Sequence, residues 1–317
     1  MKLLVTRRMT PTAEAAISAR FDTQFRDSNT PMVLDEVITA LADYDVILPT
    51  LGDAFQAPAF HAAPTRTKLL ANFGVGYNHI DIEAAKAAGV SVTNTPGVVT
   101  DATADLAVTL LLMTARRAAE GERLARSGGW TGWHPTQMLG VPVSGRTVGI
   151  VGMGRIGRAI AKRLHHGFNM RVVFFNRSPV SSLDFPALQL SDINNVMRQS
   201  DFVVIAVPGG PETYHLISAR DYDALGPDGI LINIARGDVL DEAALIAALT
   251  EGRIRATGLD VFEREPEIPV TLRKLENAVI LPHLGTAVER TRTEMALRAL
   301  DNLIAYLEGQ PLPDLIG

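Results

Sequence analysis

The sequence predicts an α/β protein built from two doubly wound, parallel-sheet domains. Two observations predict this class. Short apolar or β-branched runs alternate with helical patterns along most of the 317 residues, and beyond residue 147 these runs are apolar throughout instead of alternating with polar residues. Continuously apolar strands separated by amphipathic helices are typical of a parallel sheet that helices cover on both faces.

The first hundred residues predict the smaller domain. Its expected strands cover residues 2–6, 45–49, 68–73 and 90–94, and two helices are expected near 12–20 and 34–42. One long helix follows, with Thr100 or Asp101 as its expected N-cap and with Gly128 and Gly129 ending it. We interpret this helix as a crossing element between the domains.

The larger domain begins near residue 147. Its expected strands cover 147–152, 171–175, 201–207, 229–235, 256–261 and 278–283, with helices at 154–164, 192–198 and 241–252. A last helix near 288–307 has no strand after it, so we expect it to return to the first domain. The predicted domains are therefore 1–99 with 288–317, and 100–287.

Composition narrows the class of function. The net charge is −5 and no long basic run is present, which argues against a nucleic-acid or anionic-membrane partner. The absence of cysteine excludes disulfides, thiolate nucleophiles and cysteine-ligated metals, and we expect no metal site. The start of the chain lacks the apolar core of a signal peptide, and the longest apolar stretch, near 106–115, is too short to span a bilayer. We expect a cytoplasmic protein that acts on a small molecule.

A glycine motif lies between the first strand and first helix of the larger domain. Gly152, Gly154 and Gly157 fit the GxGxxG pattern in this context, which is that of a dinucleotide-binding turn. In such a turn the glycines allow a tight bend, close approach to a pyrophosphate and close packing of helix on strand, while the helix N-terminus faces the phosphate charge. The alternative is a glycine-rich turn with no ligand. The expected cofactor contacts extend through the turn to Met153, Arg155 and Ile156.

The end of the next strand indicates which dinucleotide is bound. Asn176 lies 19 residues beyond Gly157, where an acidic residue would hold the ribose 2′-hydroxyl of NAD. A carboxylate there would repel a 2′-phosphate, whereas Arg177 offers a charged planar fork and Asn176 and Ser178 add short hydrogen-bonding groups. We therefore expect NADP(H) to be preferred, with NAD(H) possible. The alternative for Arg177 is a solvated surface arginine.

Three polar segments follow later strands and carry the candidate catalytic residues. Arg236, Glu265 and His283 each come after an apolar strand, at the edge of the sheet where ligands bind in this architecture. An arginine can hold a carboxylate, a histidine can exchange a proton near neutral pH, and a carboxylate beside the ring can orient it and favour its charged form. Taken singly, each has a structural alternative: a strand-end arginine, a solvated glutamate and a loop histidine.

Together, these motifs resemble the D-isomer-specific 2-hydroxyacid dehydrogenase family. The resemblance rests on GMGRIG, NIARGDVLDE, GLDVFEREP and LPHLGTA, extends upstream through GVGYNHIDIEAAKAAGVSVTNTPGVVTDATAD, and covers nearly the whole chain. GGWTGWHP at 128–135 further resembles the glyoxylate and hydroxypyruvate reductase branch. The resemblance implies a Rossmann-type coenzyme domain inserted into a smaller flavodoxin-like substrate domain, an active site in the cleft, and a homodimer formed largely through the larger domain.

The resemblance also implies roles for individual residues. Arg236 would anchor the substrate, Glu265 would be the partner of the histidine, and His283 would be the acid/base. Val75 and Gly76 would hold the substrate carboxylate through their backbone, and Leu51 would contact its side chain. The remaining cofactor contacts would be Thr103, Ile234, Asp260 and Gly285 on the nicotinamide side, and Val207, Pro208 and Thr213 on the adenosine side.

Two departures from the family pattern bear on specificity. The acidic residue of NAD-preferring members is absent at Asn176, and an aromatic residue that some reductases carry late in the loop is replaced by Gln137 and Met138. Trp130 and Trp133 are expected to be dimer-contact or core residues.

The sequence thus predicts NADPH-dependent reduction of small 2-oxo acids, with glyoxylate and hydroxypyruvate foremost, to 2-hydroxy acids. The alternatives are another substrate of the family, including phosphite, or a non-catalytic dinucleotide-sensing interaction protein.

Overall fold

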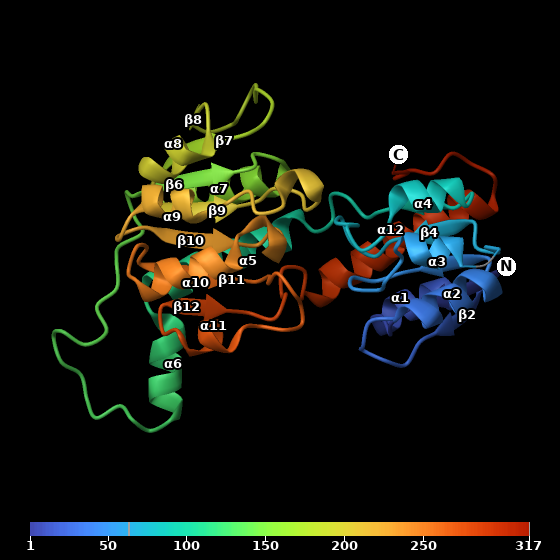
Figure 1. Ribbon diagram of the computed structural model, residues 1–317, viewed down its shortest axis with the longest axis horizontal. Helices are drawn as coiled ribbons and strands as arrows, with labels where there is room; N and C mark the ends of the chain where they lie inside the picture. Colours follow the sequence, from blue (N-terminus) through green and yellow to red (C-terminus); the bar gives the residue numbers. More distant parts are fainter. Residues whose placement is uncertain (63, 317) are drawn as a thin grey trace. The chain divides into compact units, whose positions relative to one another are not determined.

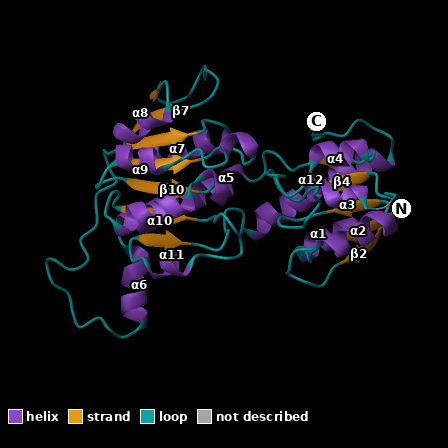
Figure 2. Ribbon diagram, viewed as in Figure 1, coloured by secondary structure: helices purple, strands orange, loops and turns teal. Residues whose placement is uncertain are grey.

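The computed structural model describes residues 1–62 and 64–316, which form two compact units. Unit 1 comprises Met1–Val99 and the chain from Thr286 onward, and unit 2 comprises Thr100–Gly285. Each unit is a parallel sheet flanked by helices, so the predicted α/β class is confirmed (Figures 1 and 2). The assignment of substrate to one unit and cofactor to the other stays a prediction.

The sheet of unit 1 has the order β2-β1-β3-β4-β5, and all of its pairs are parallel. Its strands are β1 (Lys2–Val5), β2 (Asp22–Phe25), β3 (Val46–Leu48), β4 (Leu69–Ala71) and β5 (Ser91–Thr93). The direction of strand order reverses at β1, between β2 and β3, which is the kind of position where open α/β sheets bind ligands.

Helices cover both faces of this sheet. On one face, α2 (Leu34–Asp43), α3 (Ala57–His61) and α4 (Ile82–Ala87) pack against Leu4, Ile47 and Leu70. On the other, α1 (Pro11–Ser18) and α12 (Glu289–Leu307) pack against the intervening strand residues, including Leu3 and Val46. Neighbouring residues of a strand thus enter opposite cores, as the strand repeat requires. The last helix packs on unit 1, as its sequence position suggested.

The sheet of unit 2 has the order β12-β11-β10-β9-β6-β7-β8, again with parallel pairing. Its strands are β6 (Thr147–Val151), β7 (Arg171–Phe175), β8 (Ala187–Gln189), β9 (Phe202–Ile205), β10 (Ile230–Asn233), β11 (Ala256–Leu259) and β12 (Ala278–Ile280). The order reverses between β6 and β9, so the glycine turn after β6 lies at the reversal point.

Two buried cores enclose this sheet. One face packs against α5 (Thr100–Ala115) and α7 (Arg155–Phe168), through residues such as Leu110 and Ile160. The other packs against α8 (Ile193–Arg198), α9 (Ala219–Leu225), α10 (Glu242–Thr250) and α11 (Val270–Lys274), through residues such as Tyr222 and Leu245. Two short 3-10 turns, η1 (Pro211–Thr213) and η2 (Gly237–Val239), follow β9 and β10.

The long helix predicted between the domains is broken, so that prediction was wrong. α5 ends at Ala115, and α6 (Ala118–Arg126) begins after Arg117, whose φ of 51° is left-handed. The carbonyl of Ala115 accepts a hydrogen bond from Val141 N at 2.9 Å, from a segment that returns along the helix end. Thr100 and Asp101 already lie inside α5, so neither is its N-cap. Among the described residues, no helix has the length and apolarity needed to cross a membrane.

Candidate active site

The candidate residues of unit 2 lie where its strands end. The glycine turn follows β6, Asn176 follows β7, and Val207 follows β9; Ile234 and Arg236 follow β10, Asp260 follows β11, and His283 follows β12. Because all these strands are parallel, their carboxyl ends share one edge of the sheet. The chain therefore brings the predicted cofactor and catalytic residues of this unit to one edge.

The glycine turn has the geometry that each glycine was expected to supply. Gly152 has a φ of 99°, and a Cβ there would meet the Ala206 carbonyl oxygen at 2.7 Å. A Cβ on Gly157 would lie 2.0 Å from the Gly152 carbonyl oxygen, so only glycine lets α7 approach the turn. Gly154 is the N-cap of α7, and a Cβ there would meet open space. This free N-terminus fits a dinucleotide pyrophosphate.

Two residues after β7 differ in their surroundings: the Asn176 side chain is hydrogen-bonded within the protein, and the Arg177 side chain is exposed. Asn176 Oδ1 accepts a hydrogen bond from Met153 N at 3.1 Å, and Asn176 Nδ2 donates to the Ser178 carbonyl at 2.9 Å. Asn176 therefore ties the end of β7 to the glycine turn. Arg177 is largely exposed and forms an ion pair with Glu212, in η1. A fork-shaped cation is thus displayed at the expected 2′-phosphate position, with a carboxylate beside it.

Arg236 is fixed by the turn that follows β10. The buried Asn233 side chain accepts a hydrogen bond from Ala235 N at 3.0 Å and donates one to the Arg236 carbonyl at 2.8 Å. Arg236 Nη1 donates to the Ala235 carbonyl at 2.7 Å. Burial lowers the pKa of the Arg236 guanidinium, and the carboxylates of Glu265 and Asp238 oppose this shift.

Gly237 brings the Arg236 turn close to the loop that carries Glu265. A Cβ on Gly237 would overlap the backbone of Phe262 at 1.8 Å, so the backbones of the two loops are in direct contact. The carboxylate of Glu265 is in turn fixed by Phe262, whose N–H donates to Glu265 Oε1 at 3.0 Å. This backbone contact brings the loops of Arg236 and Glu265 together, which is consistent with the effect of the Glu265 charge on the pKa of Arg236.

His283 and Glu265 form the central pair of the site. His283 Nδ1 lies 2.8 Å from Glu265 Oε2, and both side chains are about one-third exposed, at 31% and 29%. His283 has a left-handed φ of 54°, and its N–H donates to the Asp260 carbonyl at 3.0 Å. With Nδ1 engaged by the carboxylate, the other ring nitrogen is the one that can exchange a proton with a substrate.

Asp260 holds the histidine loop through its side chain. Its two carboxylate oxygens accept hydrogen bonds from Leu284 N at 2.6 Å and Gly285 N at 2.8 Å. Burial raises the pKa of Asp260, while these hydrogen bonds and the neighbouring His283 oppose the shift. A Cβ on Gly285 would lie 3.3 Å from Asp260 Oδ2 and 3.7 Å from Thr103 Cγ2, so these three predicted nicotinamide-side residues are neighbours.

The predicted adenosine-side residues lie on the loop after β9. Thr213 Oγ1 donates to the Pro208 carbonyl at 2.8 Å and closes that loop. Val207 is partly buried and Pro208 is exposed, whereas Ile234, on the nicotinamide side, is buried. The structure thus places Val207, Pro208 and Thr213 on one closed loop, which also carries Glu212.

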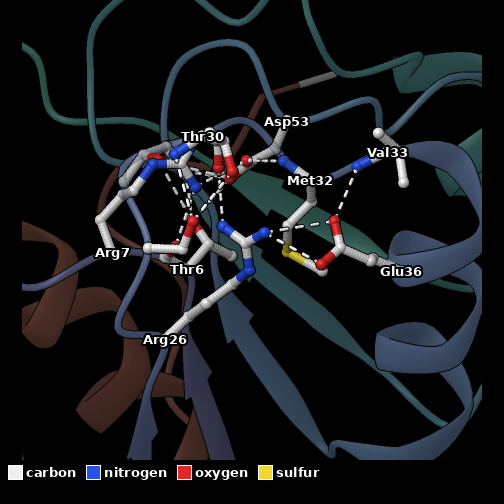
Figure 3. Close-up of polar contacts among 10 residues, drawn as sticks. Thr6, Arg7, Arg26, Thr30, Met32, Val33, Glu36 and Asp53 are labelled. Atoms are coloured by element: carbon white, nitrogen blue, oxygen red, sulfur yellow. Dashed lines mark hydrogen bonds and ion pairs between the residues drawn. The ribbon is translucent and has the colours of Figure 1, made fainter.

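In unit 1, Leu51 lies on a loop that the buried carboxylate of Asp53 fixes. Figure 3 shows the contacts of this carboxylate. Asp53 is fully buried, and its oxygens accept hydrogen bonds from Thr6 Oγ1 at 2.6 Å, Arg7 Nη1 at 2.9 Å, and Met32 N and Thr50 N at 2.9 and 3.0 Å. Arg26 forms an ion pair with Glu36 at 2.9 Å, and Figure 3 shows this pair beside the cluster. Leu51 itself is 38% exposed, so its side chain is free to meet a ligand.

Val75 and Gly76 lie on the loop after β4, in unit 1. Val75 is 37% exposed and Gly76 is partly buried. Their position after a strand of a parallel sheet again places them at the carboxyl edge, here of the smaller sheet.

Sequence reasoning missed the residues that hold the candidate ones in place. Asn233, Glu212 and Asp53 each contact a predicted site residue or fix its loop. A polar residue at the end of an apolar strand or in the loop that follows it is a usable signal: Asn233 ends β10, and Asp53 lies in the loop after β3. No sequence signal marks Glu212, because its partner Arg177 lies 35 residues away.

Fold and site together define a dinucleotide-dependent dehydrogenase. The sequence matches the D-isomer specific 2-hydroxyacid dehydrogenase family, in its NAD binding domain, over residues 108–285. The chain belongs to this family and is an NAD(P)-dependent oxidoreductase.

Relatives and solved structures cover the whole chain. It is 41% identical to the glyoxylate reductase of Thermococcus onnurineus over 321 residues, covering 100% of this chain and 96% of the relative. The TT0316 protein of Thermus thermophilus matches with a TM-score of 0.91 and 39% identity, covering 100% of both chains. An NADPH-dependent glyoxylate/hydroxypyruvate reductase of Sinorhizobium meliloti, in complex with NADP and malonate, matches with a TM-score of 0.88 and 34% identity, covering 100% of this chain and 96% of that one.

Proposed function

We propose that this protein uses NADPH to reduce small 2-oxo acids, with glyoxylate and hydroxypyruvate foremost, to 2-hydroxy acids, as the D isomer where the product is chiral. The observation that carries the proposal is the 2.8 Å pair of His283 and Glu265 beside the turn of Arg236, at the carboxyl edge of a dinucleotide-type sheet. The names of the relatives support the substrate class. An intact proton donor and anion-binding arginine favour catalysis over a purely sensing role.

The residues of unit 2 fit a dinucleotide. The open N-terminus of α7 at Gly154 suits the pyrophosphate, and Thr103, Asp260 and Gly285 would surround the nicotinamide. The family's glycine roles predict this arrangement, and the backbone geometry of Gly152 and Gly157 supports it.

The proposed chemistry divides the work between cofactor and protein. The reduced nicotinamide supplies a hydride to the keto carbon of the substrate. His283 donates a proton to the oxygen that becomes the hydroxyl, and Glu265 orients the imidazole and stabilises its positive charge. The guanidinium of Arg236 holds the substrate carboxylate and carbonyl in line with this donor. In unit 1, the backbone of Val75 and Gly76 would bind the substrate carboxylate, and Leu51 would limit the size of its side chain.

We also propose that the protein acts as a homodimer. The residues from Ala125, in the last turn of α6, to Thr136, in the loop that follows, are all exposed, and Trp130 and Trp133 are 57% and 78% exposed in the single chain. Large aromatic side chains gathered on one exposed segment are typical of a protein–protein interface. α6 and this loop extend away from the sheet of unit 2 (Figure 1).

Following nicotinamide absorbance tests the proposal directly. Glyoxylate, hydroxypyruvate, pyruvate and a longer 2-oxo acid are each offered with NADPH and with NADH, and the reverse direction is assayed with the 2-hydroxy acids and with phosphite. We expect the highest kcat/KM with NADPH as the cofactor and glyoxylate or hydroxypyruvate as the substrate. Turnover of phosphite alone, or no turnover of any 2-oxo acid with either cofactor, would contradict the proposed reaction.

A further inference from the structure

The loop after β4 is held in an unusual way by two asparagines. Asn72 is fully buried, and its Nδ2 donates to the carbonyls of Gly74 at 3.0 Å and Gly76 at 3.1 Å. Asn94 Nδ2 donates to the intervening carbonyl, that of Val75, at 2.9 Å. Three consecutive carbonyls of one exposed loop are therefore each fixed by a side-chain amide.

Because the peptide bond is planar, a fixed carbonyl also determines the direction of the next N–H group. In a trans peptide, the carbonyl oxygen of one residue and the N–H of the next point in opposite directions. Fixing the Gly74 carbonyl therefore turns the Val75 N–H away from Asn72, and fixing the Val75 carbonyl turns the Gly76 N–H away from Asn94. Within residues 1–62 and 64–316, neither N–H group has a hydrogen-bond partner. Successive free N–H groups of this kind form an anion-binding concavity.

The two amides carry different shares of this arrangement. The Gly74 carbonyl also accepts Thr95 N at 3.1 Å, so the peptide between Gly74 and Val75 has a second support. For the peptide between Val75 and Gly76, Asn94 is the one donor to the carbonyl among the described residues. Glycine on both sides of Val75 makes rotation of these peptides easy when nothing holds them. Gly74, with a φ of 153°, already has a backbone conformation that other residues avoid.

We propose that Asn72 and Asn94 are positioning residues that aim the N–H groups of Val75 and Gly76 at the carboxylate of the substrate. This inference rests on the proposed function, because it takes a 2-oxo acid as the ligand. The amides do not touch the substrate; they preorganise the backbone that does. Rigid donors bind an anion more tightly than mobile ones, because less conformational freedom is lost on binding.

Asn94 is the better residue to test, since it is partly exposed whereas Asn72 is buried. In Asn94→Leu the side chain has a similar size but no donor, and in Asn94→Asp it has the same shape but carries only acceptors. We expect KM for glyoxylate to rise about five- to tenfold, as for the loss of one orienting hydrogen bond, with kcat within about twofold. The inhibition constant of oxalate, which presents the same carboxylate, should rise in parallel. NADPH binding, followed by its fluorescence, should be unchanged.

Two controls separate the possible outcomes. Asn94→Gln keeps an amide donor on a longer side chain and should recover part of the oxalate affinity, whereas Asn29→Leu, on an exposed loop of the same unit, should leave every constant unchanged. Unchanged KM and oxalate inhibition in both Asn94 variants would overturn the inference, as would a loss that extends equally to NADPH binding or follows a lowered melting temperature. If the wild-type protein reduces no 2-oxo acid, the proposed function fails before this inference is reached.

Discussion

The hydrogen bond between His283 and Glu265 combines two effects that one substitution can separate. The carboxylate orients the imidazole at 2.8 Å, and its negative charge attracts the positive charge that the ring carries when it acts as a proton donor. Glu265→Gln keeps the size of the side chain and removes the charge. We therefore expect kcat of this variant to fall well below that of the wild type, because the proton donor loses the partner that stabilises its charge, while KM for the 2-oxo acid and NADPH binding stay similar.

The matched variant for this experiment is His283→Ala, whose kcat should fall furthest because no proton donor remains. Steady-state kinetics of both variants, with thermal melts to check folding, make the measurement. A kcat of Glu265→Gln equal to that of the wild type would mean that the glutamate only braces its loop.

The ion pair of Arg177 with Glu212 leads to a prediction about cofactor choice. A 2′-phosphate bound by Arg177 would lie close to the Glu212 carboxylate, and the like charges would repel each other. Both side chains are about four-fifths exposed, so this repulsion is screened and the pair itself adds little stability. Glu212→Gln should therefore tighten NADPH binding a few-fold and leave NADH binding unchanged.

Arg177→Asp is the opposite test at the same position. It removes the phosphate partner and adds a negative charge, so NADPH binding should weaken strongly while NADH binding stays similar or improves. Fluorescence titration with the two cofactors measures both variants. If either variant changes the two affinities equally, Arg177 has a structural role and the proposed NADPH preference loses its main support.

At the level of elements, the loop that carries Leu51 depends on one buried carboxylate. Asp53 is fully buried against Arg7, whose side chain is 13% exposed, and it also accepts backbone hydrogen bonds from two segments. Removing one partner of a buried pair leaves an uncompensated charge and typically costs about 3–5 kcal/mol. Asp53→Ala should lower the free energy of unfolding by an amount in this range, measured by urea-induced unfolding.

An exposed ion pair of the same unit provides the control. Arg66 and Asp45 are 2.8 Å apart but 52% and 31% exposed, and such a pair contributes at most ~1 kcal/mol. Arg66→Ala should therefore change stability far less than Asp53→Ala. Similar losses in the two variants would show that the Asp53 cluster is worth no more than a surface contact.

The elements that were predicted correctly from the sequence are mainly those whose residues are continuously apolar, because such segments are buried. Every strand of unit 2 from β6 to β12 was expected except β8, because continuous apolar runs leave few alternatives. β2 was missed because Asp22–Phe25 reads DTQF and lies at a sheet edge, where one side of the strand needs no apolar face. The break between α5 and α6 depends on Val141, which meets Ala115 only after the chain has folded back.

The candidate site follows the same rule. Arg236 and Glu265 follow predicted strands and His283 ends one, so their shared edge followed from parallel topology alone. What sequence could not supply is the support of these residues by side chains distant along the chain, such as Glu212 beside Arg177. No sequence signal indicated that the Asn176 side chain bonds to Met153 N and the Ser178 carbonyl, and its expected contact with the cofactor stays a prediction.

At the scale of the whole molecule, the proposed homodimer depends on one segment of unit 2, namely α6 and the loop that follows it. None of the residues of α6, all of them described, is buried, and the loop beyond it exposes Trp130, Trp133 and Leu139. Gln137 and Met138, where some reductases of the branch are expected to carry an aromatic residue, are partly buried, and Met138 Cε approaches the position of a Cβ on Gly121 of α6 at 3.7 Å. The loop is therefore attached to α6 at this point but leaves its tryptophans uncovered.

In the proposed homodimer, a second copy of the chain would cover these tryptophans. Burying two such rings in each protomer removes a large apolar area from water, which favours association. We expect the wild type to elute at twice the mass of one chain in size-exclusion chromatography with light scattering, and the double variant Trp130→Ser, Trp133→Ser to shift toward the monomer at low concentration. Leu188→Ser is the control, since Leu188 is 55% exposed on the edge strand β8 of the same unit and should leave the mass unchanged. A wild-type monomer, or a dimer that the tryptophan variant does not weaken, would show that this segment serves another purpose.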